Sequence, residues 1–186
     1  SNFNQNVEGS TFNRNMQGVN VISIKEAWNN ERFTPNDYFP GTAFRVYQFR
    51  IFTELIKEDK VIFSGFGLNA SYPKIEEKAQ YYNLFLGAEG IEGYQNKNFH
   101  NQYIQIFAEL GVLGFILLLL MLIINVKIAY KSKDFIHFAF AILMISLFLT
   151  ESFLWRQRGV VYFTMMYCLF NSGIAINNSK ASKKII

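Results

Sequence analysis

The sequence has one cysteine, Cys168, among its 186 residues. A single thiol forms no disulfide within the chain and supplies no multi-thiolate metal site, so both kinds of stabilisation are excluded. The sequence also lacks the glycine-rich phosphate loops of nucleotide-binding proteins, the HExxH motif of zinc proteases and the CxxC motif of thiol oxidoreductases. We therefore expect neither a metal nor an organic cofactor.

Acidic side chains are scarce after residue 100, where Glu109, Asp134 and Glu151 stand against eight lysines and arginines. The formal net charge of +4 comes from this half, because residues 1–100 carry nearly equal numbers of acids and bases. The basic residues flank apolar segments and do not form a basic run. We therefore expect a lipid bilayer as a partner and no nucleic acid.

Long apolar segments fill the same half of the chain. Residues 112–124 have no polar side chain, and the enclosing segment 102–126 is long enough to cross a hydrocarbon core of about 30 Å at about 1.5 Å per residue. Two more apolar segments cover 135–155 and 159–176. We predict an all-α membrane protein, the C-terminal part of a multi-pass helical bundle, in which the third segment is transmembrane or re-entrant.

Lysines set the expected orientation. The 127–134 loop and the 177–186 tail each carry three lysines, which predicts that both lie in the cytoplasm. Residues 1–100 then form a large external loop region, and the 156–158 turn lies on the same side. Arg156 and Arg158 oppose the usual charge bias of such a turn, either because it is too short to matter or because they bind an anionic partner.

The external region is predicted to be partly helical and partly irregular. Apolar residues at spacings of three and four predict an amphipathic helix over 42–57, capped by Thr42, and a short helix is expected at 24–29. No regular element is predicted over 69–98. Gly65 and Gly67 permit a tight turn or the close approach of another backbone.

His100 and Asn101 stand where the external region meets the first apolar segment. Asn101, Gln105 and Glu109 recur every four residues, so they share one helix face below His100. Ionisable groups are costly within a membrane and normally face a protein interior or a wet cavity. Histidine is the residue type that exchanges protons near neutral pH, so this polar face predicts a site at the membrane surface.

Several residues follow a pattern of one membrane protein family. The pattern has an external arginine at a helix start, a G-x-G turn, and a His-Asn pair ahead of a glycine at the head of a membrane helix. Its elements in this chain are Arg45, Gly65 with Gly67, His100 with Asn101, and Gly111. The pattern resembles the C-terminal part of the O-antigen ligase and O-antigen polymerase superfamily. The segment 151–167, ESFLWRQRGVVYFTMMY, is similar to the final loop and span of bacteroidete-type members.

The resemblance implies a metal-independent, inverting glycosyltransferase of the bacterial inner membrane, with its site facing the periplasm. Such enzymes transfer a glycan from undecaprenyl pyrophosphate to a hydroxyl of lipid A core or of another glycan. His100 is then the catalytic base, and Arg45 binds the pyrophosphate through its forked guanidinium. The other implied substrate contacts are Asn101, Gln105, Glu109, Arg156 and Arg158.

Other interpretations stay open. A polysaccharide polymerase differs in its acceptor, and a non-enzymatic transporter or receptor would bind a ligand through the external loop. His100 also suits a helix cap, Arg45 suits a solvated helix surface, and Gln105 with Glu109 suits an interhelical hydrogen-bond pair. His137 is expected at the cytoplasmic interface.

Overall fold

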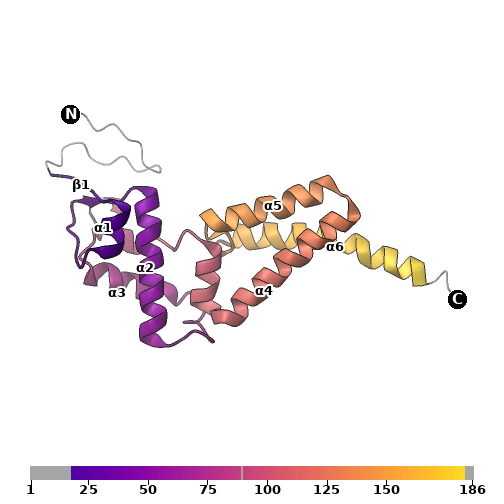
Figure 1. Ribbon diagram of the computed structural model, residues 1–186, viewed down its shortest axis with the longest axis horizontal. Helices are drawn as coiled ribbons and strands as arrows, with labels where there is room; N and C mark the ends of the chain where they lie inside the picture. The colour runs from indigo at the N-terminus through magenta and orange to yellow at the C-terminus, as the bar shows by residue number, and fades with distance from the viewer. Residues whose placement is uncertain (1–17, 89, 183–186) are drawn as a thin grey trace.

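The computed structural model describes residues 18–88 and 90–182, with side chains as far as residue 172. The ends of the predicted external region and tail, 1–17 and 183–186, lie outside the described residues. The described chain is mostly helical, as predicted. Figure 1 shows two parts, a head and a bundle. The head contains α1 (Ile24–Asn29), α2 (Gly41–Asp59) and α3 (Ser71–Tyr81), and the bundle contains α4 (Gln102–Ser132), α5 (Phe135–Thr150) and α6 (Gln157–Ser182).

Aromatic side chains form the core of the head. Phe33, Phe39 and Tyr47 are each at most 3 % exposed, and their rings contact one another at centroid distances of 4.9–5.8 Å. Such pairs add about 0.5–1.5 kcal/mol beyond the burial of their area. The head also contains two short strand pairs, β1 (Asn20–Val21) parallel to β2 (Asp37–Tyr38) and β3 (Gly87–Ala88) antiparallel to β4 (Ile91–Glu92).

α1 and α2 follow the sequence pattern closely. α1 occupies the predicted range, and Ser23 caps it: the Glu26 amide donates to the Ser23 hydroxyl, and the Ser23 amide donates to the Glu26 carboxylate. α2 extends beyond the predicted 42–57 at both ends. Pro40 is its N-cap residue, so Thr42 lies inside the first turn and the predicted Thr42 cap is wrong.

α3 contradicts the prediction of irregular structure over 69–98. Pro73 falls in the first turn of this helix, where its missing N–H removes no helical hydrogen bond. Ile75 and Ala79 lie four residues apart, face the core and are at most 3 % exposed. The segment is otherwise polar, and these two apolar residues are too few to show the three-to-four-residue spacing from which a helix is predicted.

α4 is broken at Gly111, so the predicted span 102–126 is not one regular helix. Gly111 has φ +66° and ψ −164°, a conformation that glycine alone adopts readily. The first segment of α4, 102–110, stands against the head, and the second segment leaves the head at an angle (Figure 1). Among the described residues, α4 is the one helix both long and apolar enough to cross a membrane.

α5 and α6 pack along the second segment of α4. Phe148 and Phe163 belong to the core of this bundle and are at most 3 % exposed. Other apolar side chains point outward, and Leu113, Leu143 and Met165 are 58–65 % exposed. An exposed apolar surface over all three helices suits contact with lipid or with further protein. α5 is apolar but has only 16 residues, so the count of three spans stays a prediction.

The α4–α5 connection is shorter than predicted, whereas the α5–α6 connection is longer: it covers residues 151–156, and the predicted 156–158 turn already runs into α6. α4 continues through most of the expected 127–134 loop, which leaves Lys133 and Asp134 between α4 and α5. α5 ends at Thr150, and the short η2 (Phe153–Trp155) forms the end of the predicted 135–155 segment. α6 runs past residue 176 into the predicted tail. The orientation of these connections across a membrane stays a prediction.

Candidate functional site

The head and the bundle meet where the start of α4 passes the connection between α5 and α6. Residues of α2, of the segment that leads into α4 and of the end of α5 converge here. We call this region the junction, and its residues are Arg45, His100, Asn101, Thr150 and Glu151.

His100 is held at the junction on more than one side. Its Nδ1 lies 3.5 Å from Oε2 of Glu151, an ion-pairing distance when the imidazole is protonated. Its backbone is in the left-handed region, at φ +46°, and its amide donates to Oδ1 of Asn98 over 2.9 Å. The Phe44 ring contacts the imidazole edge to face at a centroid distance of 6.2 Å. The side chain remains 23 % exposed, so the imidazole is both positioned and accessible.

Arg45 reaches the same short segment from α2. Its Nη2 donates to the carbonyl oxygen of Thr150 over 3.4 Å, and the side chain is otherwise exposed. Thr150 directly precedes Glu151, the partner of His100. The structure therefore brings together Arg45 and His100, two residues far apart in sequence that were predicted to share a site.

Asn101 is the N-cap of α4. Its Oδ1 accepts from the Ile104 amide over 3.1 Å, and its Nδ2 donates to the Leu149 carbonyl over 3.1 Å. Its backbone amide donates to Oγ of Ser152 over 3.3 Å. Asn101 thus fastens the start of α4 to the end of α5 and fixes the backbone next to His100. Contact with a substrate stays a prediction for this residue.

Gln105 and Glu109 lie in a buried network between α3 and α4. Nε2 of Gln105 donates to Oε1 of Glu109 over 3.0 Å and to Oγ of Ser71 over 2.9 Å. The Ser71 hydroxyl donates to Glu109 over 3.1 Å. Both predicted side chains are at most 7 % exposed. Their observed contacts match the interhelical interpretation, and they precede the break at Gly111, so they lie beside the head.

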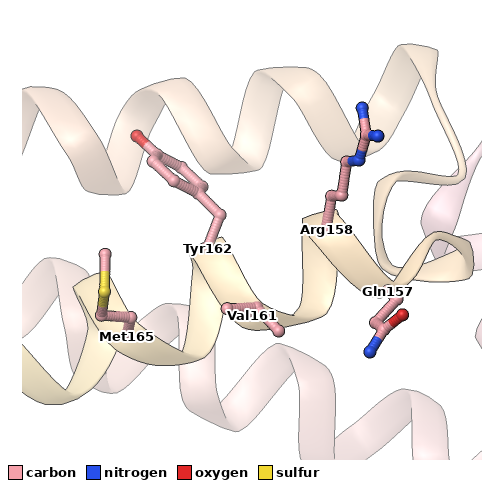
Figure 2. A pocket seen from close by; sticks show the side chains of 5 residues that line it. All are labelled: Gln157, Arg158, Val161, Tyr162 and Met165. Atoms are coloured by element: carbon pink, nitrogen blue, oxygen red, sulfur yellow. The ribbon is translucent and has the colours of Figure 1, made fainter.

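Arg156 and Arg158 lie at the start of α6, and both are exposed. Figure 2 shows Arg158 on a stretch of α6 with its guanidinium pointing to the same side as the Tyr162 ring. These two side chains border a shallow, mostly apolar hollow, which is also lined by Gln157, Val161 and Met165. Within the described residues, no hydrogen bond or ion pair connects either arginine side chain to His100 or Arg45. A contact of these arginines with a substrate therefore stays a prediction.

The rings of Tyr47 and Tyr94 pack against Phe44, the residue whose ring contacts His100. The Tyr94 ring lies 5.1 Å from the Phe44 ring, and its hydroxyl accepts from the Phe39 amide over 3.1 Å. Burial raises the pKa of Tyr94 to about 12. Burial also raises the pKa of Tyr47 on the same side of α2. Both phenols therefore stay protonated even at a pH above the ordinary tyrosine pKa of about 10.

Two groups of polar residues were not singled out from the sequence. Glu151 and Ser152 contact His100 and Asn101, and only their place within the 151–167 segment indicated them.

In the bundle, Asn125 accepts at Oδ1 from His137 Nε2 over 2.8 Å and from Asn171 Nδ2 over 3.1 Å. His137 is 1 % exposed, so its side chain faces the other helices, and its position at the cytoplasmic interface stays a prediction. The stacked Phe170 ring, 4.8 Å away, and the Asn125 contact explain its burial.

Metal-binding side chains do not cluster in the described part of the chain: no group of three or more His, Cys, Asp or Glu residues is placed to hold an ion there. Comparisons of the chain with protein-family models, with curated proteins and with solved structures find no match. The geometry of the junction therefore carries the functional argument.

Proposed function

We propose that this chain acts in a membrane glycosyltransferase of the O-antigen ligase type. The enzyme transfers a glycan from undecaprenyl pyrophosphate to a hydroxyl of lipid A core or of another glycan, on the periplasmic side of the bacterial inner membrane. The observation that carries the proposal is the convergence of Arg45 and His100 on Thr150 and Glu151, at the head of a helix that can cross a membrane.

His100 acts as the general base in this reaction. Its Nε2 takes the proton of the acceptor hydroxyl while that oxygen attacks the anomeric carbon of the donor. The bond between the anomeric carbon and the pyrophosphate oxygen breaks, and its electron pair leaves with undecaprenyl pyrophosphate. Attack opposite the leaving group inverts the anomeric centre. Glu151, next to Nδ1, positions the ring and stabilises the imidazolium that forms.

Arginine side chains stabilise the departing pyrophosphate. A guanidinium presents a planar fork that matches two phosphate oxygens, and the exposed side chain of Arg45 contacts Thr150, the residue before the Glu151 partner of the base. Arg158 offers a second guanidinium at the edge of the apolar hollow on α6 (Figure 2). A lipid-linked pyrophosphate has an anionic head group and a hydrocarbon chain. The guanidinium of Arg158 and the apolar hollow beside it suit these two parts of the donor.

The experiment is glycan transfer by the purified protein in lipid nanodiscs, with a polyprenyl-pyrophosphate-linked glycan, a hydroxyl acceptor and a metal chelator. His100→Ala should lower the rate by about a hundred- to ten-thousand-fold, the usual cost of losing a general base. Lys25→Ala, an exposed residue of α1, is the matched control and should keep the native rate. Native activity of His100→Ala, or a strict need for a divalent metal, would refute the mechanism.

A further inference from the structure

The 62–68 loop, which follows α2, presents large apolar side chains to its surroundings. Phe63 and Leu68 are both 76 % exposed, and Ile62 is 46 % exposed. No other large apolar side chain in the described part of the head is as exposed as Phe63 and Leu68. Phe63 and Leu68, five positions apart on a short loop, form a local apolar surface that has no partner in the described part of the head.

This loop is fastened to the break in α4. The Val112 amide donates to the Ile62 carbonyl over 2.8 Å, and the Phe66 amide donates to the Ala108 carbonyl over 2.8 Å. The Gly67 amide donates to the Glu109 carbonyl over 2.9 Å. The loop thus satisfies backbone groups that the break leaves without helical partners. Its position relative to α4 is therefore defined by backbone contacts.

The break marks the start of the apolar half of α4. From residue 112 to Ser132 the helix covers about 30 Å, the thickness of a hydrocarbon core. Leu113 and Leu117 follow the break at once and are 65 % and 62 % exposed. When this half of α4 spans a bilayer, Ile62 and Phe63 lie at the boundary between hydrocarbon and head groups.

We propose that the 62–68 loop is a membrane anchor, with Phe63 and Leu68 inserted into the outer boundary of the bilayer. This inference rests on the membrane position of α4 in the proposed function. The exposed Lys57 and Lys60 precede the loop, and the two acids between them are paired elsewhere, Glu58 with Lys78 and Asp59 with Lys74, so the lysine charges favour anionic lipid head groups. Apolar residues beside lysines are the usual composition of segments that lie in the membrane interface.

The anchor fixes the height of the head above the membrane. In Figure 1, α2 crosses the head, and its C-terminal end leads into the loop at the α4 break. Its N-terminal half carries Arg45 at the junction. Lipid contact at one end of α2 thereby holds the junction close to the bilayer surface, where a lipid-linked donor presents its head group.

The test is fluorescence quenching by lipids that carry a spin label, placed near the head group in one set of vesicles and deeper along the acyl chain in another. Single cysteines at Phe63, Leu68 and Leu117 are introduced into a Cys168→Ser background, labelled with a small fluorophore and reconstituted in vesicles containing anionic lipid. A cysteine at Ile24, a 55 % exposed apolar residue of α1, is the matched control. Labels at Phe63 and Leu68 should be quenched, and the label at Ile24 should not.

Each outcome separates the anchor from the membrane position of α4. Quenching at Leu117 without quenching at Phe63 and Leu68 overturns the anchor and leaves the span intact. A label at Leu117 that lipid does not quench, at any depth of the spin label, overturns the membrane position of α4 and the anchor with it. Labels at Phe63 that are shielded from water but not quenched show that protein covers the loop, which also overturns the anchor.

Discussion

Gly65 and Gly111 lie backbone against backbone: a Cβ on Gly111 would stand 2.8 Å from the Gly65 nitrogen. A Cβ on either residue would also overlap a carbonyl group of the other segment, that of Phe63 or that of Glu109. Both glycines have φ +66°. This contact attaches the head to the apolar half of α4, so no larger residue fits at either position without moving one part from the other.

Gly111→Ala should therefore destabilise the protein by about 2–4 kcal/mol, since it combines a positive φ with backbone overlap. The measurement is thermal unfolding of the purified protein in detergent. Gly90→Ala is the matched control, because Gly90 has φ +84° and no heavy atom within 4 Å of the Cβ position. The control should lose only about 1 kcal/mol, the cost of the backbone conformation alone. Equal losses would show that the close approach contributes nothing.

The sequence predicts local features of this chain better than distant ones. The α1 range, the amphipathic α2 and the apolar half of α4 follow from spacing within each segment. The close approach at Gly65 was predicted as a possibility, but its partner was not, because hydrogen bonds between the 62–68 loop and α4 depend on the folded chain. The same reason hides Glu151, which meets His100 only after α5 returns to the head.

Arg45→Lys should lower the transfer rate by roughly ten- to a hundred-fold, because lysine keeps the charge but loses the fork that binds two phosphate oxygens. The assay is glycan transfer with the donor concentration varied. Arg32→Lys, a change at an exposed residue of the head, is the control and should leave the rate unchanged. A native rate in Arg45→Lys would show that bidentate binding of pyrophosphate by Arg45 is not needed.

The stability of the head should depend on pH through Glu54. Burial works to raise the pKa of Glu54, but hydrogen bonds from Tyr82, Arg50 and Lys78 outweigh it and lower the pKa. A lowered pKa in the folded state means that this stabilisation is complete above the unfolded pKa, about 4.3, and is lost as the pH falls through the folded value. Glu54→Gln should cost about 1–2 kcal/mol at pH 7, a value reduced for partial exposure.

The corresponding measurement is unfolding of the native protein and Glu54→Gln at several pH values. The difference between them should shrink as the pH falls below the unfolded pKa of about 4.3 and through the lowered pKa of the folded carboxylate. Glu76→Gln, at an exposed position of α3, should show no such difference at any pH. A gap for Glu54→Gln that stays constant into acid would exclude the carboxylate charge as its cause.

Labelling of introduced cysteines should reveal the orientation of the bundle. In a Cys168→Ser background, cysteines at Glu92 and Gln157 should react with an impermeant thiol reagent added to intact cells. A cysteine at Ser132, in the last turn of α4, should react only after the cells are opened. The prediction rests on the lysines that surround Ser132. Reaction of Ser132 from outside would reverse the orientation and move the junction away from the periplasm.

Asn125 and His137 should stabilise the bundle jointly. Both are buried, and the Asn125 amide oxygen, which can only accept, receives hydrogen bonds from His137 Nε2 over 2.8 Å and from Asn171 Nδ2 over 3.1 Å. Asn125→Leu should cost about 1–3 kcal/mol, since it leaves the His137 donor without its partner. The double variant with His137→Phe should cost less than the sum of the two single changes, with a coupling of about 0.5–1.5 kcal/mol, as for hydrogen bonds between membrane helices. Additive losses in detergent unfolding would mean that the two side chains act independently and that packing against Phe170 alone holds His137 in place.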